Sequence, residues 1–118
     1  MYIDTKTEKI LAMILHLSGF LNGTFPIIIP LIIWLLKKDE SYFIREHGKA
    51  ALNFQLSILI LGAVAALFVF LTIGLGAIVV IPLAIIFGFL YIYFIVIATL
   101  AAYNGQLYRY PFSLEIIK

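Results

Sequence analysis

The side chains that could do chemistry in this sequence are few and lie within long apolar stretches. They are predicted to form a polar cluster inside the membrane, made of His16, Asn53, Gln55 and Ser57. Asn53 and Ser57 are four residues apart and share a helical face, whereas Gln55 is turned roughly 200° from Asn53. Two interpretations stay open. The cluster makes interhelical hydrogen bonds that fix the packing, or it lines a polar pocket or narrow path in which His16 changes charge near neutral pH.

Catalysis is not expected from these residues. The chain has no cysteine, and no carboxylate lies inside an apolar stretch. The two histidines, His16 and His47, fall on different predicted segments without a third metal ligand. Ser18 is two residues from His16, which on a helix points them apart, so a serine–histidine pair would need His47. We therefore predict a protein without enzymatic activity, cofactor or metal ion.

The composition predicts an integral membrane protein. Hydrophobic residues make up 64% of the 118 residues and charged residues only 12%, which is far from the average of soluble domains. A chain this short buries only about two-thirds of its unfolded surface, so in water it would leave large apolar patches exposed. A single all-α, multi-pass membrane domain covering residues 1–118 removes that conflict.

The charged residues divide this domain into segments. They lie in three clusters: Asp4, Lys6, Glu8 and Lys9; Lys37, Lys38, Asp39, Glu40, Arg45, Glu46 and Lys49; and Arg109, Glu115 and Lys118. Each charge-free gap between the clusters contains a turn signal, at residues 22–24 and at residues 72–76. The pattern predicts four membrane segments near residues 7–21, 25–36, 41–71 and 77–103.

The positive-inside rule favours four segments over three, because only an even number keeps all three charged clusters on one side. Both termini are then cytoplasmic. The first two segments are short, since 12 to 15 helical residues rise only about 18 to 22 Å. They form a spanning hairpin, a thin re-entrant hairpin or a single kinked helix.

Local sequence adds expectations about the ends of the segments. Thr24 is expected to cap the second segment, Pro26 suits its first turn, and Pro30 and Pro82 should kink their helices. The third segment begins with an amphipathic stretch that either turns into the membrane near Gly48 or continues as one long helix. Aromatic residues beside the charged clusters are typical of interfacial belts: Trp34, Tyr42, Tyr91, Tyr103, Tyr108 and Tyr110.

A second group of residues is predicted to lie at the membrane interface: Lys37, Lys38, Glu46, His47, Lys49, Tyr108 and Arg109. Basic residues near a membrane surface attract anionic lipid by about 1 kcal/mol each. They also determine topology without any specific ligand. Both interpretations remain open for this group.

Several motifs together resemble a known family. They are residues 16–19 (HLSG), 29–39 (IPLIIWLLKKD), 46–55 (EHGKAALNFQ), 104–105 (NG) and 108–112 (YRYPF). Over residues 7–114 the chain resembles a family of small prokaryotic membrane proteins of unknown function, which is remotely similar to the Tic translocon channel subunit of the chloroplast inner envelope. The resemblance implies four membrane helices in a prokaryotic plasma membrane, and it does not imply protein import.

Two functions are consistent with these features. The first is an accessory or scaffold subunit of a membrane complex, in which Gly62, Ala65 and Ala66 permit close helix contacts. The alternative is a minimal oligomeric channel or transporter for an ion or small solute, with His16, Asn53 and Gln55 along its path. The expected partners are membrane lipid and a homo-oligomer or larger membrane complex, and no nucleic acid.

Overall fold

The computed structural model describes residues 5–111 and 113–117. It contains four α-helices, which are α1 (Thr5–Leu17), α2 (Phe25–Lys37), α3 (Tyr42–Leu71) and α4 (Ala77–Tyr103), and a short 3-10 helix, η1 (Ser18–Phe20). Within the described residues there is no strand. The predicted all-α class is therefore confirmed. Asp4, Phe112 and Lys118, which the sequence analysis used, lie outside the described residues.

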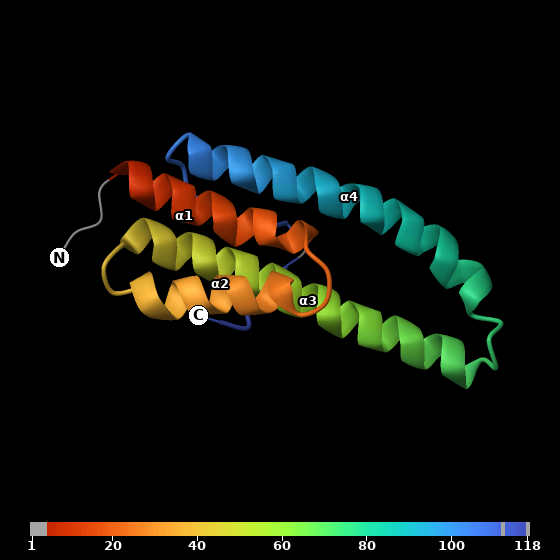
Figure 1. Ribbon diagram of the computed structural model, residues 1–118. Helices are drawn as coiled ribbons and strands as arrows, with labels where there is room; N and C mark the ends of the chain where they lie inside the picture. Colours follow the sequence, from red (N-terminus) through yellow and green to blue (C-terminus); the bar gives the residue numbers. More distant parts are fainter. Residues whose placement is uncertain (1–4, 112, 118) are drawn as a thin grey trace.

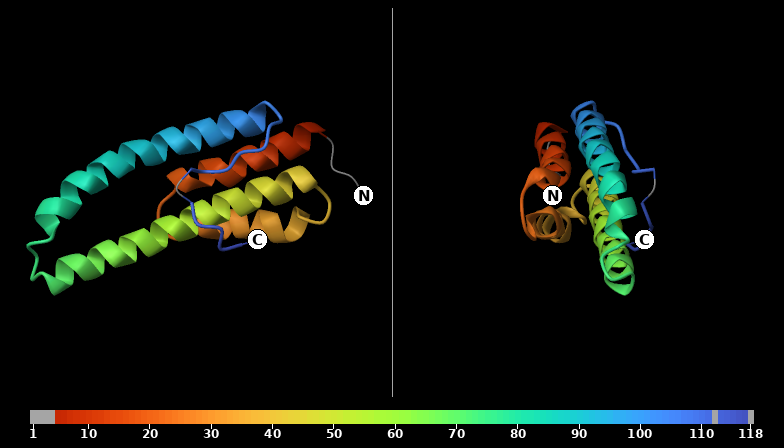
Figure 2. Two further views of the ribbon diagram at one scale, coloured as in Figure 1. Left: turned by 180° about the vertical axis from the view of Figure 1, so that it is seen from behind. Right: turned by 90° about the vertical axis from the view of Figure 1, so that its right-hand side faces the viewer.

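The helices form an elongated bundle of 55 × 22 × 22 Å. The chain reverses direction between η1 and α2, so the first apolar gap is a helical hairpin and not one kinked helix (Figure 1). This hairpin packs beside the first half of α3 and the last half of α4, and the other halves of α3 and α4 extend beyond it (Figure 2). The start of α1, the α2–α3 turn and the end of α4 lie at one end of the bundle, which we call the charged end (Figure 1).

The prediction of four membrane segments is corrected to two candidate spans. Among the described residues only α3 and α4 are long and apolar enough to cross a membrane. Helices α1 and α2 have 13 residues each, a rise of about 20 Å against the roughly 30 Å of hydrocarbon. Only 11% and 6% of the most apolar stretches of α3 and α4 are buried, so neither is the core helix of a soluble fold.

Labelling of single cysteines in a chain that has none of its own tests this arrangement. Cysteines at Lys6 and Glu40 should react from the same side of the membrane, because both lie at the charged end. A cysteine at Ile73, which is 92% exposed in the α3–α4 connection, should react only from the opposite side. The labelling is measured in sealed vesicles of both orientations. Labelling of positions 6 and 40 from opposite sides of the membrane would contradict the fold.

Local hydrogen bonds define where the helices start. The Ser41 hydroxyl accepts from the backbone N–H of Ile44 (3.1 Å) and donates to Glu8 Oε1 (2.6 Å), so it caps α3 and ties it to α1. From there α3 runs as one continuous helix past Gly48. The expected cap by the Thr24 side chain is wrong, because Thr24 has helical backbone angles and only its carbonyl accepts from the following turn. Pro26 does occupy the first turn of α2.

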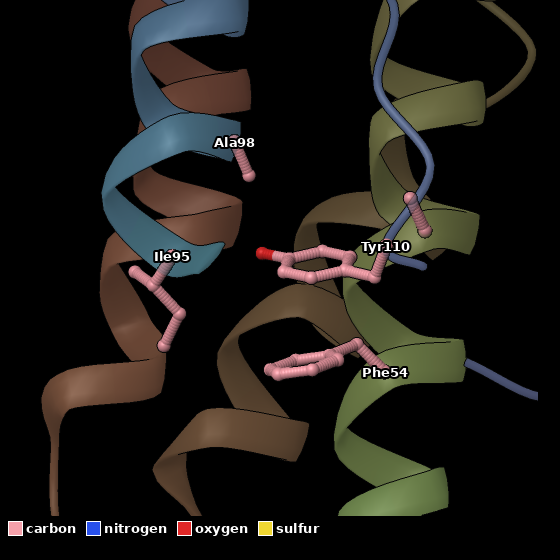
Figure 3. Packing of buried hydrophobic residues seen from close by; sticks show 5 residues of the cluster. Phe54, Ile95, Ala98 and Tyr110 are labelled. Carbon is pink, nitrogen blue, oxygen red and sulfur yellow. The ribbon is translucent and has the colours of Figure 1, made fainter. Parts of the chain in front are cut away.

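The core lies in the half of the bundle next to the charged end. One cluster joins Leu15, Ile44 and Ala51, from α1 and α3. The second joins α3 and α4 through residues 104–111 and 113–117, which we call the strap. There the Tyr110 ring stacks on Phe54, with ring centres 4.0 Å apart, opposite Ile95 and Ala98 of α4 (Figure 3). The strap therefore fills the space between α3 and α4 on this side.

Candidate functional site

A chain of buried hydrogen bonds connects α1, α3 and the strap. His16 Nδ1 lies 2.7 Å from the Tyr110 hydroxyl, and His16 Nε2 lies 2.8 Å from His47 Nδ1. His47 Nε2 lies 2.8 Å from the carbonyl oxygen of Gln106. The two imidazole rings meet edge to face, with centres 5.0 Å apart, and both side chains are buried. The structure thus brings together two histidines that are 31 residues apart.

The direction of every hydrogen bond in this chain follows from the Gln106 carbonyl, which can only accept. His47 Nε2 must therefore carry a hydrogen, which leaves Nδ1 of the neutral ring as an acceptor. His16 Nε2 must then donate to His47 Nδ1, and His16 Nδ1 accepts from the Tyr110 hydroxyl. Burial raises the pKa of Tyr110 and keeps this hydroxyl protonated as a donor. Both imidazoles are neutral, and each of their four nitrogens has a partner.

Both ends of this chain of hydrogen bonds belong to the strap. Gln106 and Tyr110 bracket the histidine pair, so His16 and His47 hold the strap against α1 and α3. No buried side-chain nitrogen or oxygen in the described part of the chain lacks a hydrogen-bond partner. The Ser18 hydroxyl donates to the carbonyl of Leu15 (3.0 Å) rather than to either histidine. The described geometry therefore contains a structural clamp and not a serine–histidine pair.

Acid should weaken this clamp. Burial, and secondarily the neighbouring His47, lower the pKa of His16 from 6.5 to about 3. Above pH 6.5 the folded and unfolded forms are both neutral at His16. Between pH 6.5 and 3 only the unfolded form takes up the proton, so the free energy of unfolding should fall by several kcal/mol. Unfolding in detergent micelles as a function of pH measures this loss, and His16→Phe should show a flatter profile; equal slopes would contradict the assignment.

Asn53 and Ser57 hold the end of the strap. The Asn53 amide donates to the carbonyl of Ile117 (3.0 Å) and accepts from its N–H (2.6 Å), as a paired backbone would. The Ser57 hydroxyl accepts from the N–H of Leu114 (2.8 Å) and donates to the Asn53 carbonyl (2.7 Å). The predicted shared face of these two residues is thus used to bind the strap.

Replacement of Asn53 tests this contact. Asn53→Leu removes both hydrogen bonds to Ile117 and should cost about 1–2 kcal/mol of stability. Hydrogen exchange should show that the Ile117 amide loses its protection in Asn53→Leu. In Ser57→Ala, the Leu114 amide should lose its protection first. If the Ile117 amide exchanges at the same rate in wild type and Asn53→Leu, the strap is not held there.

Gln55 points to the other side of α3, as predicted, and joins α4 to η1. Its Nε2 donates to the Tyr91 hydroxyl (2.9 Å), which donates to the carbonyl of Gly19 (2.6 Å). The approach is close: a Cβ at Gly19 would lie 2.6 Å from Ile95 Cδ1 and 2.8 Å from Gln55 Nε2. A side chain at position 19 would separate the helices, so the small residue is required for this hydrogen bond.

The charged end contains one carboxylate shared by several cations. Glu46 pairs with Arg109 of the strap (3.1 Å), with Lys49 (3.2 Å) and at longer range with Arg45 (3.9 Å). At the end of α2, Lys38 lies over the Trp34 ring, 4.4 Å from its centre, and Lys37 pairs with Glu40 (3.4 Å). The predicted interfacial group is therefore divided, because His47 lies in the buried histidine pair and Tyr108 packs edge to face on Tyr110.

The predicted polar cluster is likewise divided into three contacts: His16 with His47 and Tyr110, Asn53 and Ser57 with the end of the strap, and Gln55 with Tyr91. The sequence analysis did not identify Gln106, and it assigned Tyr110 to an interfacial belt, although Tyr110 is buried. One feature of the sequence does indicate that Tyr110 is not on a helix, since it lies shortly after Gly105 in a segment without helical periodicity. No local feature of the sequence indicates which histidine Tyr110 contacts.

Two adjoining cavities, of about 490 and 360 Å³, lie between the halves of α3 and α4 that extend beyond the hairpin. Both are lined almost entirely by apolar side chains, and both include Ile58, Leu61, Phe87 and Tyr91. Of the predicted polar cluster, His16, Asn53 and Gln55 line neither cavity, whereas Ser57 lines the larger one. These cavities therefore do not form the polar path that the sequence suggested as an alternative.

Comparison with known proteins identifies the family. Residues 7–117 match the family model MamF/MmsF, described as the magnetosome magnetite crystal formation protein family. The chain belongs to the MamF/MmsF family. No curated protein and no solved structure matches it.

Membership of the MamF/MmsF family bears on two expectations. The expected resemblance to a small prokaryotic family is confirmed at that level, and the match covers the hairpin, α3, α4 and nearly all of the strap. The remote likeness to the Tic channel subunit receives no support from any comparison. The histidine clamp, the Asn53 contact and the Gln55 contact all lie within the region that matches the family.

Proposed function

We propose that this chain is a non-catalytic, multi-pass accessory or scaffold subunit of a membrane complex, acting where a prokaryotic membrane supports the formation of magnetite crystals. The family match supports the place of action. Helices α3 and α4 anchor the protein in the membrane, and the charged end faces the cytoplasm, in agreement with the positive-inside rule.

One observation carries the non-catalytic assignment: the polar side chains inside the bundle are used to hold the protein together. The histidine pair, Asn53, Ser57 and Gln55 each bind a partner within the chain. The two cavities are lined almost entirely by apolar side chains, and their polar lining residues, Ser57 and Tyr91, are hydrogen-bonded within the chain. The surfaces that remain for partners are the charged end and the apolar outside.

A complementation experiment tests the proposal. In a magnetosome-forming bacterium deprived of its own family members, the wild-type chain should restore crystal size and number, as measured by electron microscopy. It should also co-purify from mild detergent with other membrane proteins. A chain that always emerges alone and leaves the crystals unchanged would contradict the proposed role.

The double variant His16→Phe/His47→Phe separates a structural role from a chemical one. If the histidines only hold the strap, crystals should be normal whenever the variant reaches wild-type abundance. A folded, abundant double variant that fails to restore crystals would show that the imidazoles act chemically, and the non-catalytic assignment would be wrong. Immunoblotting of the membrane fraction supplies the abundance control.

A further inference from the structure

The strap fills one part of the space between α3 and α4 and leaves the part beyond the hairpin open. In the half of the bundle next to the charged end, Tyr110 of the strap occupies the space between the two helices (Figure 3). Beyond the hairpin, α3 and α4 stay apart (Figure 1). The two adjoining cavities lie between these helices, and Phe54 lines the larger one. We call these two cavities together the α3–α4 groove. Apart from Leu114 of the strap, its walls belong to the candidate spans, so the groove lies in the hydrocarbon region of the membrane.

The length of the groove fits one acyl chain of a phospholipid. The wall on α3 runs from Phe54 to Val64 in the larger cavity, a rise of about 15 Å. That length is half of the roughly 30 Å hydrocarbon core, which is the depth of one leaflet.

The charged end supplies a place for a headgroup along the same face of α3. Residues 46, 49, 53, 57, 60 and 64 recur at intervals of three or four and therefore lie on one side of the helix. Along this face, residues 60 and 64 in the groove are apolar, Ser57 and Asn53 follow toward the charged end, and the cations that pair with Glu46 lie beyond them. Even with the exposed Glu115 of the strap counted, the cations Arg45, Lys49 and Arg109 leave this region positive.

We propose that the α3–α4 groove is a phospholipid-binding site. It holds an acyl chain of an anionic phospholipid from the leaflet next to the charged end, with the headgroup beside Lys49 and Arg109. The apolar lining selects the acyl chain, and the cations favour the anionic headgroup. This site does not depend on the proposed role in crystal formation, because it follows from the shape and charge of the bundle alone.

Groove-filling variants test the acyl-chain part. A Cβ added at Gly62 or Gly88 meets no atom within 4 Å, and both glycines line the smaller cavity. Gly62→Leu/Gly88→Leu should therefore fill the groove without a clash. Native mass spectrometry of the delipidated protein, titrated with phosphatidylglycerol, should show binding weakened at least tenfold. The matched control Ala63→Leu, at an exposed position on α3 that lines neither cavity, should bind like wild type.

Charge variants test the headgroup part. Lys49→Gln should reduce the preference for phosphatidylglycerol over phosphatidylcholine about fivefold, which corresponds to about 1 kcal/mol. Lys38→Gln, whose side chain lies over Trp34, should leave the preference unchanged. An unchanged preference in Lys49→Gln would overturn the headgroup assignment.

Two further outcomes would overturn the site as a whole. The first is a wild-type protein that binds no phospholipid, or a folded groove-filled variant that binds as tightly as wild type. The second is a lipid-free dimer that the leucine pair converts to a monomer, since the groove would then receive a second copy. If the leucine pair does not fold, Leu61→Trp repeats the test, because Leu61 lines both cavities.

Discussion

His47→Phe is expected to lower the free energy of unfolding by about 2–5 kcal/mol. The ring of His47 is fully buried and both of its nitrogens are bonded. Phenylalanine would leave the buried His16 Nε2–H without a partner, which costs about 1–3 kcal/mol. It would also remove the hydrogen bond to the carbonyl of the exposed Gln106, which adds about 0.5–1.5 kcal/mol. Thermal or chemical unfolding in detergent micelles measures the loss.

The double variant His16→Phe/His47→Phe provides the control for this prediction. When both imidazoles are replaced, no imidazole N–H is left facing an apolar ring. The double variant should therefore lose less free energy of unfolding than the two single variants lose together. Hydrogen exchange should also show that the strap loses protection around Gln106 in His47→Phe. Additive effects with a fully protected strap would show that the histidine pair does not hold it.

Gly48→Ala is expected to separate α2 from α3, because there is no space for one additional methyl group. A Cβ at Gly48 would lie 2.4 Å from Cδ1 of Trp34 and 3.0 Å from its Cγ. The indole also donates to the carbonyl of Arg45 (3.1 Å) and would have to abandon this hydrogen bond to move. Overpacking of this kind costs about 1–3 kcal/mol, and the lost hydrogen bond adds about 1 kcal/mol.

Trp34 reports directly on this displacement, since it is the only tryptophan in the chain. Its emission maximum should shift in Gly48→Ala together with the loss of stability. Gly62→Ala, on the same helix but in open space, should leave both the emission and the stability close to wild type. Rescue of Gly48→Ala by Trp34→Leu would identify the indole as the cause, and an unshifted emission in Gly48→Ala would contradict the close contact.

These predictions concern contacts between helices, and the sequence analysis was least informative there. It identified His16 and His47 as separate residues on different segments, and the pairing that it considered for His47 was with Ser18. It placed Asn53 and Ser57 on one face and Gln55 on another, which is correct because both follow from helical periodicity within α3. It left open what these side chains bind, because the partners come from the strap and from α4.

Local properties of the sequence determined the helices themselves. Several features are visible in the sequence without a structure: the runs of apolar residues, the turn signals at residues 72–76, the proline in the first turn of α2 and the position of every charge. They were sufficient to predict an all-α protein whose two longest helices can cross a membrane. The same reading overestimated α1 and α2, since charge-free length alone does not show whether a 13-residue helix crosses the membrane or packs beside longer ones.

Only the tertiary structure decided which polar groups meet. A shift of one residue along a helix turns a side chain by about 100°, so the pairing of His16 with His47 depends on the axial position of α1 against α3. That position is determined by distant contacts, such as Ser41 with Glu8 and Tyr110 with Phe54. The strap, which has no periodic pattern of its own, obtains its place from those same helices.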